Sequence, residues 1–581
     1  MHMKTKFLLY ILSLILWVGC SLEEDRESFT DRYNSYQNTF QAESVVKSCY
    51  EDVAQLFNSS SAMMMEIASD LWFQSTSVVD AISAISPARP GQGSRIWQRC
   101  YNGIMRANEV IECVLASDIN EKDKMAIQAE ARVLRAFFYY YLTNTFNGIP
   151  FYTCMVKDMQ TMEMIRTLPR TDAKIIRTTL YEDLRDNAIP YLPAVHANEI
   201  KGNRMGHAMG LMLMAKFAMW NKEWKQAIES LEALEDIYGV LDEANYPLEE
   251  TVWWLKNTKE SIFEVQHEWK ADGIQFTSTV CTNMYPVISS DSSLDGVMMP
   301  QWGERLSSHT CARATWHFAA YRLQTIDIND TTSVRKPSDQ ENENYTKSIF
   351  DPLPLECSYN IHDYMNSSKT QWKRRYKTQI SLDAVRNMTI RGKKIDRRVF
   401  YVLGFGNFET GETFRNVAEE GQAYGGMKFW IPARTANYDS NNYKIFRYAD
   451  AVLMMAECWC NEGNYKKALE YLNYTRARAG VDGYDVSTYS DHNSIMKLVR
   501  DERARELGGE LHRRYDLVRW GIWYNEVKKR QNSGVTILSN IQPYHEYYPI
   551  PDTQCALSGY VLTNPEYGFS TGGEGDTNEN E

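Results

Sequence analysis

Apolar residues recur at helical spacing over most of the chain outside its middle third. In Asn108–Phe146 they lie three and four positions apart, and the segment is followed by Asn147-Gly148-Ile149-Pro150. Glycine and proline at this place favour the end of a helix. The pattern predicts one or two amphipathic helices that end near Phe146.

Two further segments, Ala208–Tyr238 and Tyr448–Ala479, predict helical hairpins. The first helix of the earlier hairpin is predicted to end at Trp220. In both hairpins an aromatic residue (Trp224 or Tyr465) is followed by two residues, then Ala, then Ile or Leu, and then Leu three positions later. Such small residues let helices approach closely, as in tetratricopeptide repeats. Because Trp224 and Tyr465 are far apart in the sequence, the two hairpins are not consecutive repeats. They indicate one helical framework with a large insertion.

The insertion, between Tyr246 and Tyr443, differs from the rest of the chain. It is rich in Ser, Thr, Asn, Asp and Gly, and its aromatic residues follow no helical period. Only short pieces such as Ser261–Gln266 and Val399–Leu403 read as strands. The sequence therefore predicts a mainly α protein whose helical hairpins frame an irregular, loop-rich region with a few short strands. Long irregular segments of this kind usually carry function.

The first twenty residues predict export. Lys4 and Lys6 precede the apolar run Phe7–Val18, which is as long as the core of a signal peptide and too short to span a bilayer. A small residue directly before Cys20 resembles a bacterial lipoprotein signal, in which Cys20 becomes the lipidated first residue. An ordinary secretory signal that ends near a cysteine is the alternative.

Composition limits the possible partners. The 581 residues carry a net charge of −12, which becomes about −14 once Lys4 and Lys6 leave with the signal. An acidic protein is a poor match for nucleic acid or for anionic lipid. The 36 tyrosines and 15 tryptophans combine a flat apolar face with a polar atom, which suits stacking against sugars or peptides. The ten cysteines besides Cys20 are scattered, and their pairing cannot be read from the sequence.

Short motifs occur in a fixed order along nearly the whole chain. They are Trp97–Asn108, Ala129–Tyr140 with Gly148–Pro150, Asn203–Trp220, Phe446–Glu457, Asn473–Gly480, Asp501–Leu507, Arg514–Gly521, Tyr548–Pro551 and Asn564–Gly568. Each motif is weak alone. Their order, behind a lipoprotein signal, resembles the SusD/RagB family of outer-membrane lipoproteins. The segment 21–25, which contains the acidic residues Glu23, Glu24 and Asp25, also resembles the surface-export tag of lipoproteins in the Bacteroidetes.

The resemblance implies a SusD-like fold and a role in nutrient uptake. Such proteins act as a lid on a SusC-like, TonB-dependent transporter and deliver an oligosaccharide, or in some relatives a peptide, without covalent chemistry. It implies a lipid-anchored protein on the surface of the outer membrane, with no cofactor. The expected divisions are a signal peptide (1–19), an N-terminal helical part (20–245), the insertion (246–443), a C-terminal helical part (444–568) and a disordered acidic tail (569–581).

The C-terminal motifs contain many charged residues that could be mistaken for an active site. These are Arg447, Asp450, Glu457, Glu502, Arg503, Glu506, Arg514, Asp516 and Arg519. Paired carboxylates can perform acid–base catalysis. Alternating charges on helices beside aromatic residues more often form an ion-pair network, which is the interpretation we prefer. No catalytic residue is predicted.

Two regions combine aromatic and hydrogen-bonding residues outside any helical period, as sugar recognition requires. They are Leu71–Arg95 and Asn283–Tyr321, and family members tend to place their ligand-binding aromatics in these regions. The candidate ligand-binding residues are Trp72, Phe73, Arg89, Tyr285, Trp302, Arg305, Trp316, His317 and Tyr321. For each aromatic residue, burial beneath its own loop is the alternative. Trp97, Trp220, Trp224 and Trp459 fall on helical faces and are assigned to the core.

Signatures of enzymes and metal sites are missing from the sequence. There is no His-Glu-x-x-His, no Gly-x-Ser-x-Gly and no phosphate-binding loop. A surface glycoside hydrolase remains an alternative, with Asp291 and Asp295 as its nearest carboxylates. We assign Cys458 and Cys460 to core packing and Asp327–Asp330 to a solvated turn, so no metal site is predicted.

Overall fold

The computed structural model describes residues 36–57, 65–74, 85–253, 255–268, 277–278, 312–314, 358–365, 372–379, 389–390, 393–394, 396–398, 427–429, 440–529 and 541–568. The signal peptide with Cys20, the predicted strand Val399–Leu403 and the predicted tail 569–581 lie outside these residues. Among the helices that are described, none is both long and apolar enough to cross a membrane.

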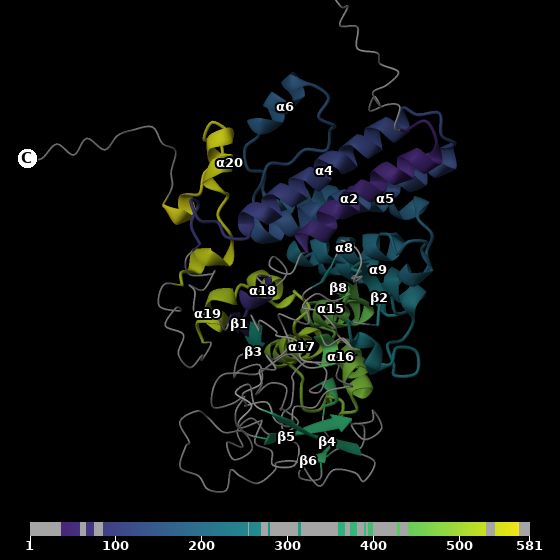
Figure 1. The fold of residues 1–581 in the computed structure, drawn as a ribbon, viewed down its shortest axis with the longest axis vertical. Coiled ribbons are helices and arrows are strands. Elements are labelled where there is room, and N and C mark those ends of the chain that lie inside the picture. Colours follow the sequence, from purple (N-terminus) through teal and green to yellow (C-terminus); the bar gives the residue numbers. More distant parts are fainter. Residues whose placement is uncertain are drawn as a thin grey trace, which may run out of the picture.

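Three long helices form the N-terminal layer, which Figure 1 shows side by side: α2 (Thr39–Leu56), α4 (Gly93–Leu115) and α5 (Glu121–Phe146). The predicted helical segment Asn108–Phe146 is thus two helices. The break is set by Asn120, whose side chain accepts a hydrogen bond from the amide of Asp123 and caps α5. Gly103 of α4 lies against Phe138 of α5, where a Cβ would come 2.2 Å from the ring. Glycine at this position lets the two helices pack closely.

Both predicted helical hairpins are confirmed. The first consists of α8 (His207–Trp220) and α9 (Trp224–Tyr238), and the second of α15 (Tyr448–Asn461) and α16 (Tyr465–Ala479). Helix α15 packs against α9, so the hairpins adjoin each other although the insertion separates them in sequence. Of the four tryptophans assigned to the core, Trp97 is buried. The other three are half-buried and pack against the hydrophobic core.

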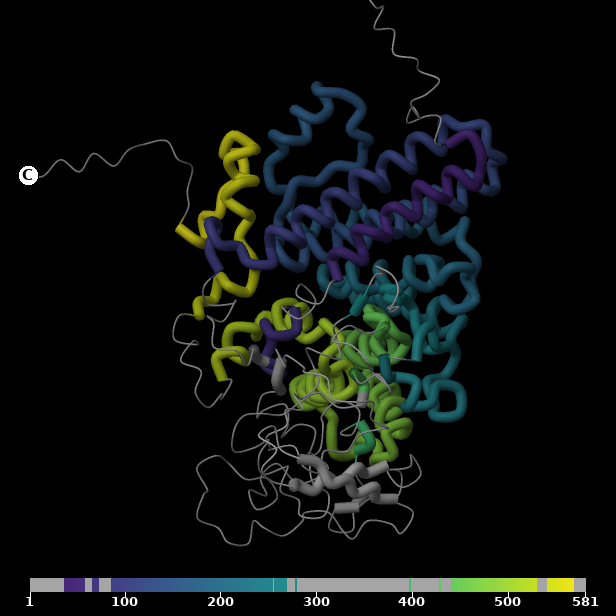
Figure 2. Tube along the Cα trace, viewed as in Figure 1, coloured from purple at the N-terminus to yellow at the C-terminus, as the bar shows by residue number. Residues whose placement is uncertain are grey.

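The remaining helices complete the framework around these hairpins. They are α6 (Met159–Arg166), α7 (Ala173–Asn187), α17 (His492–Leu507), α18 (Arg513–Arg519), α19 (Trp523–Lys528) and α20 (Asp552–Leu557), with short 3-10 helices η2 (Ile189–Tyr191), η3 (Ala197–Glu199), η4 (Leu248–Thr251), η6 (Met427–Phe429), η8 (Pro543–Glu546) and η9 (Pro565–Tyr567). The C-terminal segment, yellow in Figure 2, returns to the N-terminal helices, where the amide of Tyr548 donates to the carbonyl of Thr145 at 2.8 Å.

The described strands form four antiparallel pairs. They are β1 (Trp72–Gln74) with β3 (Ala312–Ala314), β2 (Ser261–Val265) with β8 (Tyr443–Arg447), β4 (Ser358–Met365) with β5 (Trp372–Gln379), and β6 (Thr389–Ile390) with β7 (Lys393–Lys394). Strand β2 confirms the prediction for Ser261–Gln266. The pair β2–β8 joins the two ends of the insertion, because β2 lies near its start and β8 at its end.

The predicted ion-pair network is confirmed in the core. The guanidinium of Arg447 contacts Glu260, Glu506 and Glu510 at N–O distances of 2.7–2.8 Å. Arg478 pairs with two of the same carboxylates, at 2.9 Å from Glu260 and 2.5 Å from Glu506. Burial by itself would raise the pKa of Glu506, but the surrounding arginines hold it well below its ordinary value. These carboxylates are therefore ionised, paired and inaccessible to solvent.

A second part of the network joins the N-terminal helices to the C-terminal ones. Asp450 of α15 is 2.7 Å from Lys216 of α8 and 2.9 Å from Arg503 of α17. Burial opposes ionisation of Asp450, yet Lys216, His512 and Arg503 lower its pKa. Arg514 differs from the prediction, because its guanidinium donates to the carbonyl groups of the 545–546 segment and not to a carboxylate.

Stability should decrease as the pH falls from about 6.5 to 4. Burial lowers the pKa of His512 and of His267 to about 4, whereas the unfolded histidines take up protons near pH 6.5. At each of these histidines the unfolded chain binds more protons than the folded one in this window, so acid favours unfolding by on the order of 3 kcal/mol per histidine. Glu66, whose pKa burial raises to about 7, acts in the opposite direction and offsets about one of the two histidines. The midpoint of thermal unfolding, measured from pH 7.5 to 4.5, should fall, and the variant with both His267→Gln and His512→Gln should fall less steeply. A midpoint independent of pH over this range would contradict the interpretation.

Candidate ligand-binding region

Strand pairing brings together the two regions that the sequence singles out for ligand binding. Strand β1 belongs to Leu71–Arg95 and β3 to Asn283–Tyr321, and they pair antiparallel with Trp72 opposite Ala314 and Gln74 opposite Ala312. Figure 1 shows the pair beside α18 and α17. Segments more than two hundred residues apart in sequence thus contribute to one place in the fold.

The segment that leads into β1 is fixed to the C-terminal helices. Arg513 of α18 donates to both carboxylate oxygens of Asp70 at 2.8 Å. The carboxylate of Glu66 accepts hydrogen bonds from the amides of Gly509 (3.2 Å) and Leu511 (2.8 Å). Burial raises the pKa of Glu66 to about 7, although these amide bonds act in the opposite direction.

Two aromatic side chains hold β1 and the segment before it against the interior. The indole of Trp523 donates to the carbonyl of Ala68 at 2.8 Å. The ring of Trp72 is 0% exposed and meets Phe429 edge to face, with ring centroids 6.2 Å apart. Gly509 has φ +81°, and a Cβ there would come 2.3 Å from the same Phe429 ring, so a side chain does not fit. Trp72 thus faces the interior and holds β1 in place.

The structure locates the other candidates only in part. The backbone of Phe73 lies in β1 next to Trp72. Arg89 is exposed in the loop before α4, where its amide donates to the carbonyl of Ser86 at 2.9 Å. Tyr285, Trp302, Arg305, Trp316, His317 and Tyr321 lie outside the described residues, as do Asp291, Asp295 and Asp327–Asp330.

Residues within the insertion fasten it to the ion-pair network, which sequence reasoning did not foresee. Arg398 pairs with Asp396 at 2.7 Å and with Glu502 at 2.5 Å, and all three side chains are buried. Lys428, also buried, forms an ion pair with Glu510. No signal in the sequence pointed to this attachment, because the C-terminal motifs themselves contain as many arginines as carboxylates.

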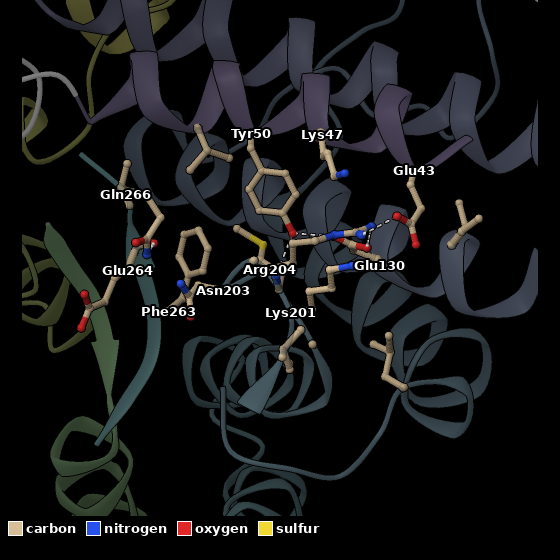
Figure 3. Close-up of a pocket in the computed structure, with 18 of the residues that line it drawn as sticks. Glu43, Lys47, Tyr50, Glu130, Lys201, Asn203, Arg204, Phe263, Glu264 and Gln266 are labelled. Carbon is tan, nitrogen blue, oxygen red and sulfur yellow. Dashed lines mark hydrogen bonds and ion pairs between the residues drawn. The ribbon is translucent and has the colours of Figure 1, made fainter. Parts of the chain in front are cut away.

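A separate cavity of about 790 Å³ lies between α2, α5, the loop 192–206 and β2 (Figure 3). At its wall the hydroxyl of Tyr50 donates to Glu130 at 2.6 Å and accepts from the amide of Met205 at 2.7 Å. Arg204 is hydrogen-bonded to Glu130 at 2.7 Å. The sequence does not predict this cavity, because four distant segments form it. Three of them contain motif or strand residues (Glu130, Asn203–Met205 and 263–266), but nothing in the local patterns brings these segments together.

Within the described ranges, no three His, Cys, Asp or Glu side chains lie close enough to hold a metal ion. Cys458 and Cys460 are buried free thiols, as predicted for core packing. Burial raises the pKa of the Cys460 thiol to about 12, which makes it a poor metal ligand.

Comparison with known proteins adds independent findings. Residues 25–189 match a family profile described as "Starch-binding associating with outer membrane", and residues 419–567 match the profile of the SusD family. SusD-like protein P25 of Formosa agariphila is 25% identical over 482 residues, which cover 81% of this chain and 78% of that protein.

Solved structures have the same fold. A SusD homolog from Bacteroides thetaiotaomicron has a TM-score of 0.64 at 18% identity, covering 92% of this chain and 98% of its own. Surface glycan-binding protein A from the same species, solved in complex with laminarihexaose, has a TM-score of 0.57 at 17% identity, covering 90% of this chain and 99% of its own.

Proposed function

Because this chain belongs to the SusD/RagB family, we propose that it is a surface lipoprotein that binds an oligosaccharide or polysaccharide and delivers it to a SusC-like, TonB-dependent transporter of the outer membrane. The observation that carries the proposal is the β1–β3 pair, which joins the two regions rich in aromatic and hydrogen-bonding residues. Glycan sites need such a combination, because pyranose rings stack on flat apolar faces while their hydroxyl groups need polar partners.

The proposed binding surface contains Phe73 and Arg89 from the first region. From the second region it contains Tyr285, Trp302, Arg305, Trp316, His317 and Tyr321. Trp72 serves this surface as a support, since its ring is buried against Phe429. In this arrangement the tryptophans and tyrosines stack on sugar rings, and the arginines and His317 bind hydroxyl groups.

The proposed role involves binding without chemical conversion. Members of the family bind glycans, and the charged residues of the C-terminal motifs that could suggest catalysis are buried, most of them in ion pairs. A carboxylate that acts as a general acid or base must reach its substrate. Glu506 and Asp450 lie in the core and cannot do so.

The proposed location is the outer membrane, with a lipid on Cys20 as the anchor. The profile matched by residues 25–189 supports association with this membrane. The transporter is the proposed partner because members of the family work in such pairs. The helical hairpins α8–α9 and α15–α16 are the surface that we expect to face it.

Calorimetry of residues 21–581 against a panel of oligosaccharides and peptides tests the proposal. The panel includes laminarihexaose, the ligand of one solved relative, and each mixture is analysed for reaction products. We expect one glycan class to bind without turnover, and Trp302→Ala or Trp316→Ala to weaken binding at least about tenfold, a loss typical of a stacked ring at the centre of a site.

The matched control is Tyr191→Ala, because Tyr191 is an exposed aromatic residue in the N-terminal half, outside both regions. This variant should bind like the unmodified protein. Binding of peptides alone would keep the fold and overturn the ligand class. Release of product would overturn the claim of binding without chemistry and direct attention to Asp291 and Asp295.

A further inference from the structure

Exposed apolar side chains gather at one end of the molecule. Of the fourteen large apolar residues that are exposed in the described part of the chain, eight belong to the start of α2, the end of α4, helix α6, and α20 with the turn after it. We call this set the apolar end; it consists of Phe40, Leu115, Met159, Met162, Met164 and the three exposed apolar residues of the segment 557–561. Figure 1, with the longest axis vertical, shows these elements toward the top.

Polar contacts connect the elements of the apolar end to one another. The Thr39 hydroxyl, at the start of α2, donates to a carboxylate in the first turn of α5 at 3.0 Å, next to the end of α4. Glu112, in the last turn of α4, forms an ion pair with Lys157 at 2.8 Å, two residues before α6. Arg166, at the end of α6, donates to the carbonyl of Leu557. The apolar end is therefore a continuous part of the fold.

Helix α6 projects from the apolar end. None of its eight residues is buried, and Met159 is 73% exposed. A surface helix usually buries one apolar face, and a helix of this length is not stable alone in water. Here Asp158 caps α6 by accepting from the amide of Thr161 at 2.7 Å, and Arg166 holds its other end against α20. The fold thus maintains an ordered projection whose methionines face solvent.

The turn after α20 also presents apolar side chains. Gly559 and Tyr560 have φ values of +66° and +61°. The left-handed region is unfavourable for an aromatic residue, and backbone strain of this kind often occurs in functional segments. Tyr560 and Val561 are nonetheless exposed. A strained turn that exposes two apolar side chains is typical of a contact surface.

The charged groups around α6 and α20 neutralise one another. Three ion pairs border this part of the apolar end: Lys157–Glu112, Arg166–Glu163 and Arg170–Glu566. A strongly charged partner would have to compete with these pairs. Their neutrality favours an uncharged apolar partner.

The segment that leads to Cys20 joins the fold at the same end. Residues 21–35 separate Cys20 from Tyr36, which directly precedes α2. About fifteen residues span at most about 50 Å. With the lipid on Cys20 that we propose above, the start of α2 stays within this distance of the bilayer. Weak contacts then suffice, because a tether raises the effective concentration of the two surfaces.

Exposed apolar patches mark contacts with proteins or with membranes. Separate projections at the ends of several helices suit a fluid lipid surface better than a rigid partner, and the tether brings lipid to this end. We propose that the apolar end rests on the lipid surface of the outer membrane, with its side chains at the boundary of headgroups and acyl chains. This inference rests on the proposed anchor at Cys20. Figure 1 shows the β1–β3 pair away from this end, so docking leaves the proposed glycan surface free.

Methionine oxidation tests this surface. Residues 21–581 with an N-terminal histidine tag are bound to vesicles of phosphatidylcholine and phosphatidylethanolamine that contain a nickel-chelating lipid, and are treated with hydrogen peroxide. Peptide mass spectrometry gives the oxidation rate of each methionine. We expect Met162 and Met164 to oxidise at least about threefold more slowly than beside vesicles without the nickel lipid, as when about two thirds of the molecules are docked. Met105, exposed on α4, should oxidise at an unchanged rate.

The double variant Phe40→Asp, Met159→Asp should lose this protection. Both residues are more than 70% exposed and lie in the first turns of α2 and α6, where an acidic residue favours the helix. The matched control is Val240→Asp, Val486→Asp, which makes the same change of charge at exposed residues that follow α9 and α16. The control should be protected like the unmodified protein.

Equal oxidation rates with and without the nickel lipid, or protection that the Phe40, Met159 variant retains, would overturn the proposal. Protection that arises without vesicles as the protein concentration increases would also overturn it, because a second copy would then cover the apolar end. The tag replaces the lipid on Cys20, so a negative result counts against this surface alone. The mass of the N-terminal peptide of the native protein tests the anchor separately, and calorimetry tests the glycan site.

Discussion

Replacing Arg447 with Met is expected to destabilise the protein by about 3–5 kcal/mol, the usual result of removing one partner from a buried ion pair. The Arg447 guanidinium donates to Glu510 at 2.8 and 3.0 Å, to Glu260 at 2.7 Å, and to Glu506 at 2.8 Å through its carboxylate and 2.7 Å through its carbonyl. Methionine fills most of the volume but leaves these carboxylates without their shared cation. Their pKa values should rise, and the protein should become sensitive to the pH of the assay near neutrality.

Urea unfolding followed by tryptophan fluorescence measures this effect. The control is Arg185→Met, which removes an exposed arginine paired with Asp186 and should leave the unfolding curve unchanged. Asp186 stays hydrated in that variant, whereas the three partners of Arg447 stay buried. An Arg447→Met protein as stable as the control would mean that the network is not the connection between the insertion and the helical framework.

The second large effect is expected from Asp70→Ala. Asp70 is buried, and its two oxygens accept hydrogen bonds from Arg513 at 2.8 Å. Its removal leaves a buried guanidinium without this bidentate partner, for which a loss of about 3–5 kcal/mol is typical. Asp70 also directly precedes Leu71 and β1, so the strand that joins the two proposed binding regions loses its attachment.

Two measurements separate these consequences. Urea unfolding gives the loss of global stability, and calorimetry at a temperature well below the unfolding midpoint gives glycan affinity. We expect Asp70→Ala to weaken glycan binding at least about tenfold while most molecules remain folded, because the site must reorder on binding. Asp52→Ala is the control, since Asp52 is a buried carboxylate of α2 that pairs with Arg99 and Arg106, outside the β1 attachment. If both variants bind glycan equally well, the attachment of β1 does not position the site.

The helical part of the fold could be read from the sequence because its signals are local. Helix α8 ends at Trp220 and α16 at Ala479, where the apolar period and the following turn residues place them. The ion-pair network could be anticipated for a similar reason. Glu502, Glu506 and Arg503 lie on one helix with apolar neighbours, so their charges must be neutralised within the core.

The site was predictable only to the level of regions. Strand β1 has three residues, too few for a period, and its partner β3 is distant in sequence. Trp72 looked like a ligand contact because it stands among polar residues, yet it fills the space beside Phe429. Whether Trp72 faces inward depends on strand pairing that the local sequence does not specify. The cavity of Figure 3 was missed because its lining comes from four separate segments.

The central claim is that Leu71–Arg95 and Asn283–Tyr321 form one glycan site across the β1–β3 pair. Hydrogen exchange measured by mass spectrometry, with and without the glycan that calorimetry identifies, tests it most directly. We predict slower exchange in both regions at the same glycan concentration, with 263–266 unchanged. Protection of only one region, or of neither while the glycan is bound, would contradict the claim.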